Sequence, residues 1–394
     1  MSDDLLLTFN ADSSTVKIGL FTLESGIARC VGKGTIDFRL RLLTFSLADG
    51  STIPSMPLIV DAEADLRSAL EEAFGLLAQH FDMKAVVTVG HRVVHGGDAY
   101  TGPVLIDDGT LDRIDALTSL APLHQPRSMR LIRAIRHVHT TLPQTASFDT
   151  AFHRGQTELV RRFAIPRALH EKGIKRYGFH GLSYKFVIGE FSRKYPAFAN
   201  RKVVAAHLGS GASLCALDGG ISRDTSMGFS TLDGIPMATR CGALDPGTVL
   251  HLLGAGGRSL RDVEDLLYHQ SGLLGVSGIS ADCRILLESD RPEAKEALDL
   301  FTFRIAGEVA RLTATLGGLD AIVFTAGIGE HQPGIRDMIC DRLEWLGVAL
   351  DPAANADNAG AIGTCSSRVG VFVIPTDEEQ VIADEALSIL SGKG

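Results

Sequence analysis

The stretch LLLTFNADSSTVKIGLF, Leu5–Phe21, places two apolar runs around a short polar segment. Apolar runs bounded by turn residues are typical of the two strands of a hairpin, so we expect strands at Leu5–Phe9 and Val16–Phe21. Asn, Asp and Ser are common turn residues, and the polar segment could serve the fold alone. It nevertheless gathers an amide, a carboxylate, three hydroxyls and, at Lys17, an ammonium, which raises the question of a binding role.

The bulk composition limits the class of protein. A chain of 394 residues exceeds one ordinary core, so two domains are expected. A content of 45% hydrophobic and 22% charged residues is typical of a soluble globular protein. No apolar run reaches the roughly 18 residues of a membrane span, and the acidic Asp3 and Asp4 argue against a signal peptide. The six cysteines are scattered without a C-x-x-C pair, which favours a reduced, cytoplasmic enzyme.

The net charge of −9 also bears on partners. Without a Lys/Arg block to offset it, this charge disfavours a nucleic-acid partner. If the substrates are anions, the positive charge that binds them must be local, in a cleft.

The strand–turn–strand pattern returns in the second half as KVVAAHLGSGASLCALDGG, Lys202–Gly220. Two such hairpins predict two similarly built α/β domains that face a common cleft. We place the first domain at residues 1–151 plus 379–394 and the second at 152–378. Further on, AIVFTAGIGEH, Ala321–His331, reads as a strand, a Gly-rich turn and a helix, which can present backbone N–H groups to an anion. The remaining pattern predicts helices at 65–80, 109–120 and 127–140 and strands at 85–89 and 147–149.

Two stretches after strands carry candidate anion-binding groups. GHRVVHGGDAYTGP places Arg92 at a strand end, where its guanidinium can bind an anion in a fork; the alternative is an ordinary surface loop. APLHQP sets His124 between prolines, and a structural histidine is the plainer reading there.

Two further stretches carry a carboxylate and a histidine. Asp149 in SFDTAFH can accept a bond from an arginine or orient a metal, and its alternative role is a helix N-cap. His180 in RYGFHGLSY is flanked by Gly178 and Gly181, and glycines let the backbone approach a ligand closely. A turn histidine with an internal partner is the competing interpretation.

The least periodic stretch is RDTSMGFSTLDGIPMATRCGALDPG, which contains Arg240. Long loops without secondary structure are usually functional. In SADCRI, Asp282 could hold a ribose hydroxyl and Arg284 could stack on a base, although a helix cap with a solvated charge fits equally well. TDEEQ resembles a capping box with Thr376 as N-cap and Glu379 as its partner, which would leave Glu378 for a metal.

Together these groups suit phosphoryl transfer, where catalysis consists of positioning and charge neutralisation. The chain has no G-x-x-x-x-G-K-[ST] motif, which excludes a P-loop enzyme. The G-x-G at Gly209 and Gly211 lacks the third glycine and the acidic residue of a dinucleotide fingerprint.

The ordered motifs NADSSTVK, GHRVVHGG, PLH, FDTAFH, YGFHG, HLGSGAS, DTSMGFSTLDG, ATRCGALDPG, FTAGIGEH and PTDEE closely resemble the acetate kinase family over essentially the whole chain. GHRVVHGG, YGFHG and DTSMGF are the most specific of them. The resemblance implies the acetate and sugar kinase, heat-shock protein and actin superfamily. Its members have two similar α/β domains, a duplicated ribonuclease H-like fold, around a nucleotide cleft that closes over ATP and Mg²⁺.

The resemblance also implies residue roles. Arg92 and Arg240 would hold the carboxylate and the transferring phosphoryl group. His180 would donate to the equatorial oxygens of that group, with His124 supporting the same site, and Asp149 would orient an arginine near the metal. Asn10 and Glu378 match the Mg²⁺ (or Mn²⁺) site, and Ser13 and Lys17 match the first phosphate loop. The nucleotide cleft is matched by His207, Leu208, Gly209, Ser210, Gly211, Asp282, Cys283, Arg284, Gly327, Ile328, Gly329 and Glu330.

The family reaction is reversible, direct in-line transfer of the ATP γ-phosphoryl group to acetate, giving acetyl phosphate and ADP. A carboxylate is already deprotonated at neutral pH, so no general base is needed. The difficulty is bringing one anion up to another, which two arginines and a metal ion address. The resemblance further implies a homodimer, without nucleic acid or membrane as a partner.

The sequence departs from the family pattern at four positions. Asp12 stands where Gly is usual, and Ser210 and His331 stand where Asn is usual. Thr231 replaces the proline of a T-P-L motif, whose proline lines the pocket for the acetate methyl group together with the positions of Val94 and Leu123. We hypothesise a relaxed pocket that accepts propionate, since a pocket discriminates one methylene by only about 1–3 kcal/mol.

Three alternatives remain. The first is a propionate or other short-chain acyl kinase. The second is a non-catalytic nucleotide-binding regulator on the same fold; Asp12 and Ser210 favour it, whereas the intact phosphoryl-group positions oppose it. The third is a sugar kinase, which would need Asp149 as a general base for a hydroxyl.

Overall fold

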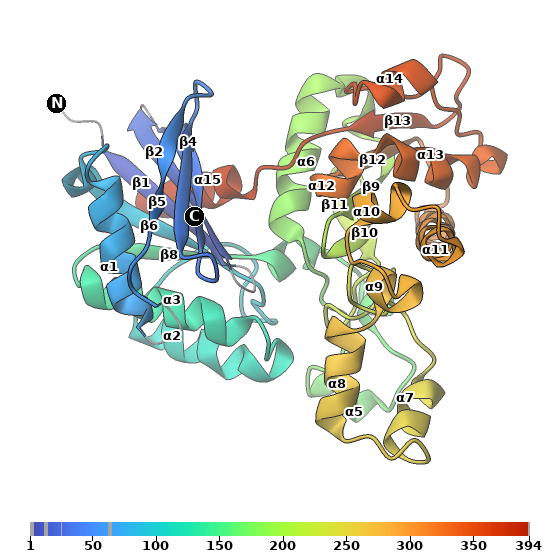
Figure 1. The fold of residues 1–394 in the computed structure, drawn as a ribbon, viewed down its shortest axis with the longest axis horizontal. Coiled ribbons are helices and arrows are strands. Elements are labelled where there is room, and N and C mark those ends of the chain that lie inside the picture. Colours follow the sequence, from blue (N-terminus) through green and yellow to red (C-terminus); the bar gives the residue numbers. More distant parts are fainter. Residues whose placement is uncertain (1–3, 12–14, 25, 62–64, 393–394) are drawn as a thin grey trace. The chain divides into compact units, whose positions relative to one another are not determined.

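The computed structural model describes residues 4–11, 15–24, 26–61 and 65–392. The chain forms two compact units (Figure 1), the first from residues 1–152 and 377–394 and the second from residues 153–376. In both, strands and helices combine into a mixed α/β architecture built on one sheet.

The first unit contains an eight-stranded sheet with the order β5-β4-β3-β2-β1-β6-β8-β7. The hairpin predicted at the amino terminus is confirmed: β1 pairs with β2 in antiparallel register, and Lys17 lies opposite Asn10. β1 also pairs in parallel with β6, which pairs in parallel with β8. These strands are β1 (Leu5–Ala11), β2 (Thr15–Glu24), β3 (Ile27–Asp37), β4 (Leu42–Leu47), β5 (Thr52–Pro57), β6 (Val86–Val93), β7 (Val104–Leu105) and β8 (Gln144–Phe148).

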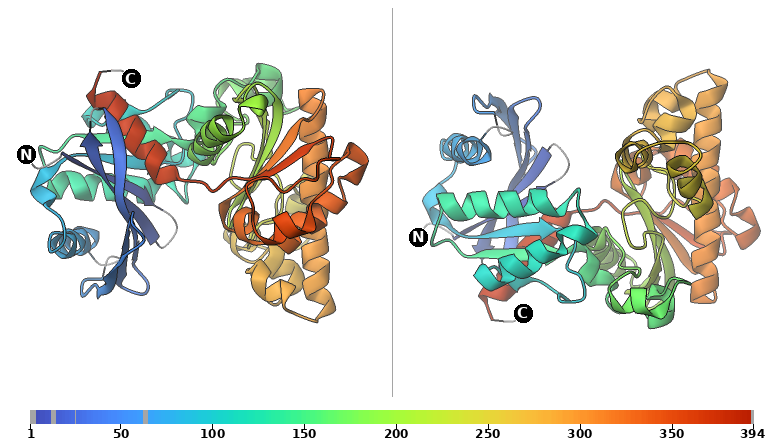
Figure 2. Two further views of the ribbon diagram at one scale, coloured as in Figure 1. Left: turned by 90° about the horizontal axis from the view of Figure 1, so that it is seen from above. Right: turned by 90° about the horizontal axis from the view of Figure 1, so that it is seen from below.

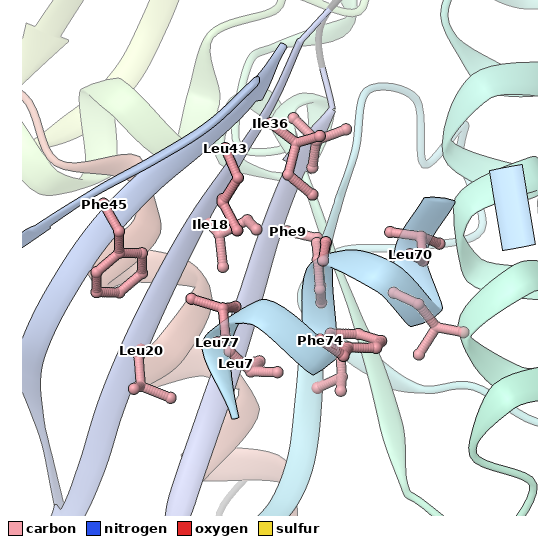
Figure 3. Close-up of a cluster of buried hydrophobic side chains, with 14 of the residues drawn as sticks. Leu7, Phe9, Ile18, Leu20, Ile36, Leu43, Phe45, Leu70, Phe74 and Leu77 are labelled. Atoms are coloured by element: carbon pink, nitrogen blue, oxygen red, sulfur yellow. The ribbon is translucent and has the colours of Figure 1, made fainter. Parts of the chain in front are cut away.

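The alternation of side chains along β1 places helices on both faces of this sheet. Leu7 and Phe9 belong to a core that includes Phe74 of α1, and Figure 3 shows this cluster. Leu6 points to the other face and packs with Ala383 of α15, the red helix along this sheet in Figure 2. Successive strand residues face opposite sides, so one fully apolar strand can hold two layers of helices. The helices are α1 (Leu66–Leu77), α2 (Asp108–Asp115), α3 (Gln125–Val138) and α15 (Glu378–Leu390).

The parallel core of this sheet determines where its polar residues meet. β1, β6 and β8 run in the same direction, so their carboxyl ends share one edge. Asn10 and Arg92 lie near the ends of β1 and β6, and Asp149 follows β8 directly. The strand expected to end at 147–149 is confirmed, since β8 ends at Phe148, and a short 3₁₀ helix, Asp149–His153, begins at the aspartate.

The second unit repeats this arrangement in a five-stranded sheet with the order β11-β10-β9-β12-β13. The second predicted hairpin is confirmed as β9 and β10. As in the first unit, three antiparallel strands are followed by a parallel strand that pairs with the first of them. The strands are β9 (Lys202–Leu208), β10 (Ala212–Asp218), β11 (Ile221–Thr225), β12 (Ala321–Thr325) and β13 (Gly370–Val373).

The helices of the second unit include two that flank the site. α6 (Gly181–Lys194) begins directly after His180, and α12 (Ala326–His331) follows β12. The other helices are α4 (Glu158–Arg161), α5 (Arg167–Glu171), α7 (Pro246–Leu253), α8 (Leu260–His269), α9 (Gly272–Ser277), α10 (Cys283–Leu287), α11 (Pro292–Leu316), α13 (Pro333–Asp341) and α14 (Pro352–Ala356). None of the helices in the described ranges is both long and apolar enough to span a membrane.

Candidate functional site

Arg92 and Asp149 form the central ion pair of the first unit. Arg92 donates from Nε and Nη2 to Oδ2 of Asp149 at 3.0 and 2.6 Å. Asp149 is fully buried and the Arg92 side chain is 15% exposed. A buried carboxylate requires a paired cation and hydrogen bonds, so each partner holds the other in place. The contact with an arginine that was expected for Asp149 is therefore present. The helix that begins at Asp149 is only a short 3₁₀ turn.

Asn10 connects this pair to the C-terminal helix. Its Oδ1 accepts a hydrogen bond from Nη1 of Arg92 at 3.1 Å. Its Nδ2 donates to Oε2 of Glu378 at 2.8 Å and to Oε1 of Glu379 at 3.0 Å. One amide thus bridges a guanidinium and two carboxylates. Glu379, which was expected to cap a helix, instead belongs to this cluster.

The cap of α15 corrects a sequence-based prediction. The N-cap is Asp377 and not Thr376, because the Asp377 side chain accepts from the backbone N–H of Gln380 at 2.9 Å. Asp377 also pairs with Lys33 on β3. A carboxylate at this position is favoured by the positive end of the helix dipole. Glu378 is then the first residue of the helix.

The donor set at the edge of this sheet fits a magnesium ion that is shared with a substrate phosphate. No group of three or more His, Cys, Asp or Glu within the described residues is arranged to hold a metal by itself. Mg²⁺ is usually held through one or two carboxylates, with waters and substrate phosphates completing its shell. Of the two residues expected at the metal, Glu378 is a carboxylate of this kind, and Asn10 has an amide oxygen on the neighbouring side chain.

The remaining expected residues of the first unit lie around this cluster. Val94 is buried directly after β6. Leu123 and His124 are half-buried and precede α3. Gln125 donates from Nε2 to the carbonyl of His95 at 3.0 Å, which keeps these two segments side by side. Lys17 is exposed on β2, and Ser13 lies outside the described residues.

In the second unit, two stacked histidines face the glycine turn. The rings of His180 and His207 are stacked with centroids 4.2 Å apart. His180 Nδ1 lies 2.8 Å from Oγ of Ser213, and His207 Nδ1 lies 2.8 Å from Oγ of Ser183. His180 has a φ of +58° at the N-cap of α6. A non-glycine residue with positive φ is strained and often marks a functional position.

The turn between β9 and β10 brings an arginine and a histidine together. A Cβ at Gly211 would lie 3.3 Å from Nε2 of His180 and 3.6 Å from Nη1 of Arg240. A Cβ at Gly209 would lie 3.8 Å from Nε2 of His207. Both histidines therefore direct Nε2 toward this turn. Cationic and N–H groups around a small turn suit a phosphate.

Arg240 is held by its own loop. Its Nη1 donates to the carbonyl of Thr231 at 3.3 Å. Tyr268, which the sequence analysis missed, lies against this loop: burial raises its pKa, whereas hydrogen bonds to Ser230 and Thr231 and the charge of Arg240 lower it. Tyr268 lies on α8, and no local feature of the sequence linked that helix to the loop.

Hydrogen bonds hold the second glycine-rich segment, Ala326–His331, at both of its ends. Oε1 of Glu330 accepts from the backbone N–H groups of Ala326 and Thr376 at 2.7 and 3.1 Å. The fully buried Arg336 donates from Nη1 to the carbonyls of Gly329 and Glu330 at 2.8 and 3.0 Å. Its burial lowers the pKa of Arg336 to about 10. The expected residues Gly327, Ile328, Gly329 and Glu330 all belong to α12, and Leu208 is buried at the end of β9.

The helix cap expected for Asp282 is present, and Arg284 takes part in it. Asp282 is the N-cap of α10 and accepts from the backbone N–H of Arg284 at 2.9 Å. The Arg284 guanidinium also pairs with the same carboxylate. Cys283 is buried between them, and burial raises its pKa to about 11. Their bonds within the described chain link these two charges to each other and not to the glycine turn at 209–211.

The candidate residues divide between the two units. Asn10, Arg92, Asp149 and Glu378 belong to the first, whereas His180, Arg240 and the two glycine turns belong to the second.

Comparison with known proteins places this geometry in a family. The sequence model of the Acetokinase family matches residues 5–384. An acetate kinase from Rhodopseudomonas palustris is 45% identical over 397 residues, which cover 99% of both chains. One from Rhizobium meliloti is 44% identical over 393 residues, covering 98% of this chain and 99% of that protein.

Solved structures agree with this match. The crystal structure of a propionate kinase from Francisella tularensis superimposes with a TM-score of 0.90 at 34% identity, covering 98% of this chain and 100% of the other. An acetate kinase from Porphyromonas gingivalis gives 0.86 at 30% identity, with the same coverage. The fold is the two-domain α/β fold of the acetate and sugar kinase, heat-shock protein and actin superfamily, and the chain belongs to the acetate kinase family.

Proposed function

We propose that this protein transfers the γ-phosphoryl group of ATP to acetate, reversibly, giving acetyl phosphate and ADP. The observation that carries the proposal is the convergence of His180 Nε2 and Arg240 Nη1 on Gly211. A guanidinium and an imidazole beside a glycine turn suit a phosphoryl group whose charge must be neutralised during transfer.

The chemistry requires positioning rather than proton abstraction. Acetate is ionised at neutral pH and attacks phosphorus directly and in line, and the γ-phosphoryl bond to ADP breaks as the acyl-phosphate bond forms. In this proposal Arg92 binds the acetate carboxylate, while Arg240 and His180 bind the oxygens of the transferring group. Asp149 orients Arg92 through their buried pair, and His124 supports the phosphoryl site.

A magnesium or manganese ion completes the proposed site. Asn10 and Glu378 would hold it, with Asp149 nearby, and the 2.8 Å hydrogen bond between Asn10 and Glu378 keeps their side chains together. When bound, the ion neutralises phosphate charge.

The remaining residues bind the two substrates. Val94, Leu123 and Thr231 form the proposed pocket for the acetate methyl group, and Ser13 and Lys17 form the first phosphate loop. We place the reaction in the cytoplasm and expect a homodimer. The proposed nucleotide residues are His207, Leu208, Gly209, Ser210, Gly211, Asp282, Cys283, Arg284, Gly327, Ile328, Gly329 and Glu330.

The test is ADP release from ATP with Mg²⁺ and formate, acetate, propionate or butyrate, with each acyl phosphate trapped as its hydroxamate. Acetate should be the best acceptor. Absence of hydroxamate from every acid, with ATP still bound, would overturn the proposal in favour of a nucleotide-binding regulator. ADP release with a sugar and not with a carboxylate would favour a sugar kinase.

Propionate kinase is the second candidate. Thr231 favours it, because this residue replaces a rigid proline ring by an open side chain with a hydroxyl in the proposed acceptor pocket. The likeness to the Francisella tularensis propionate kinase agrees with this candidate. Equal or faster turnover with propionate would establish it, and propionate turnover below a hundredth of that with acetate would reject it.

A further inference from the structure

A chain of hydrogen bonds leads from Tyr184 through Ser213 to His180. The hydroxyl oxygens of Tyr184 and Ser213 are 2.6 Å apart, and Ser213 Oγ is 2.8 Å from Nδ1 of His180. Tyr184 and Ser213 are both fully buried. Tyr184 lies on α6, one turn after His180, and Ser213 lies on β10 beside the glycine turn. The chain therefore ties the imidazole to both elements that shape the proposed phosphoryl site.

The hydrogen atoms that each group carries allow this chain to run from Tyr184 to His180. Burial raises the pKa of Tyr184 well above its usual value, so its hydroxyl keeps a hydrogen to donate. A serine hydroxyl has one hydrogen to donate and can accept as well. When Ser213 accepts from Tyr184, its own hydrogen is directed to Nδ1 of His180. Nδ1 then acts as an acceptor, and a neutral imidazole must carry its hydrogen on Nε2.

The stacking of His180 on His207 disfavours a positive charge on both rings at once. The His180 ring stacks on that of His207 at 4.2 Å, and two imidazolium cations at such a distance would repel each other. Nε2 of His180 is the atom nearest to a Cβ at Gly211. A hydrogen on Nε2 is therefore directed toward the turn.

We infer that Ser213 and Tyr184 are positioning residues that hold His180 as the neutral Nε2–H tautomer, in which it donates a hydrogen bond to the transferring phosphoryl group. This inference rests on the proposed function and deepens it. Donors that are fixed before the reaction lose less free energy to reorganisation in the transition state. Partners of this kind, where they orient metal-ligating histidines, contribute about 10- to 100-fold to activity or affinity.

The first test reads the tautomer and requires no activity. In the full chain labelled with ¹⁵N-histidine, the spectrum assigned through a His180→Gln variant should show Nε2 protonated and Nδ1 unprotonated at pH 7.5. Ser213→Ala should shift His180 toward a mixture of both tautomers. A wild-type His180 with its hydrogen on Nδ1, or a tautomer unchanged by Ser213→Ala, would overturn the inference.

The second test is a double-mutant cycle on kcat. Ser213→Ala and Tyr184→Phe should each lower kcat about tenfold, with a smaller change in the KM for ATP. In a His180→Ala background they should cost nothing further, because no imidazole is left to orient. An equal loss in that background would assign both residues a merely structural role and overturn the inference. Tyr184→Phe keeps the buried ring, so it stays informative if Ser213→Ala folds poorly.

Ser222→Ala is the matched control. Ser222 Oγ lies 2.8 Å from Nδ1 of His153, a buried serine–histidine pair on the neighbouring strand. Its removal should leave the His180 tautomer unchanged; a tautomer shift as large as that in Ser213→Ala would count against the specific role of Ser213. A wild-type chain with the expected tautomer and no acyl phosphate would overturn the proposed function instead.

Discussion

Nδ2 of Asn10 lies 2.8 Å from Oε2 of Glu378, although 368 positions separate the two residues in the sequence. The contact joins the N-terminal hairpin to the first turn of the C-terminal helix. Because Asn10 also accepts from Arg92, the polar edge of the first sheet depends on both ends of the chain. A truncation that removes α15 would therefore remove two carboxylates from this edge.

Asn10→Ala tests this bridge. The substitution leaves the buried Glu379 without its amide donor, and loss of a buried hydrogen-bond partner costs about 1–3 kcal/mol. We expect the free energy of unfolding in urea to fall by this amount and the Mg²⁺ concentration for half-maximal activity to rise. Thr22→Ala, at a half-buried position of β2 away from this cluster, is the control. Unchanged stability and metal dependence would contradict the bridging role.

Arg92 and Asp149 should show strong coupling in stability. Arg92→Ala leaves a fully buried carboxylate without its cation, and breaking a buried ion pair costs about 3–5 kcal/mol. Adding Asp149→Asn removes the unpaired charge and should restore part of the stability while activity stays lost. Urea unfolding of the two single variants and the double variant measures this. Additive losses would show that the pair is not coupled.

The strands were predictable from the sequence because apolar runs and turn residues are local signals. The contacts among the candidate site residues could not be predicted from the sequence, because they depend on strand register and on pairing between distant segments. Ser213 lies opposite His207 across β9 and β10, and a shift of one residue would turn its hydroxyl to the other face. Thr376 was predicted as the N-cap of α15 from its spacing to Glu379. The hydrogen bond from the backbone N–H of Gln380 to the Asp377 side chain shows that Asp377 is the N-cap. Tyr268 reaches Ser230 and Thr231 only because the loop folds back on α8.

Arg240→Ala should affect catalysis much more than folding. Arg240 is half-buried, and its Nη1 donates to the neutral carbonyl oxygen of Thr231 at 3.3 Å, a contact whose loss costs only about 1 kcal/mol. By analogy with arginines that stabilise transferring phosphoryl groups, kcat should fall by roughly 10³ or more. Acyl hydroxamate assays with thermal unfolding as a folding control measure both effects. A loss below tenfold in a folded variant would remove Arg240 from the mechanism.

Three buried histidines should make the protein sensitive to mild acid. Burial lowers the pKa of His91, His95 and His153 to about 4. Between pH 6.5 and about 4 the unfolded chain therefore binds more protons than the folded one, so stability falls as the pH is lowered. Each histidine contributes a slope of at most about 1.4 kcal/mol per pH unit.

His91→Gln isolates one of these contributions. His91 Nε2 lies 2.7 Å from Oε1 of Gln144, and glutamine can keep that bond without titrating. Urea unfolding at several pH values should give a smaller slope for this variant below pH 6.5. The exposed His80 provides the control substitution His80→Gln. A slope equal to that of the wild type would show that His91 does not contribute.

Thr231→Pro should narrow the range of acids that the protein phosphorylates. Thr231 adjoins Arg240 through its carbonyl and lies against Tyr268, and its side chain belongs to the proposed acceptor pocket. A proline ring at this position is rigid and apolar, and one methylene in an apolar pocket is discriminated by about 10- to 200-fold. We expect kcat/KM for propionate relative to acetate to fall at least tenfold.

Tyr268→Phe is the control and removes only the hydroxyl. If this variant merely loosens the loop, kcat should change for both acids while the ratio of their kcat/KM values stays the same. An unchanged ratio in Thr231→Pro, with acetate turnover retained, would remove Thr231 from the pocket wall.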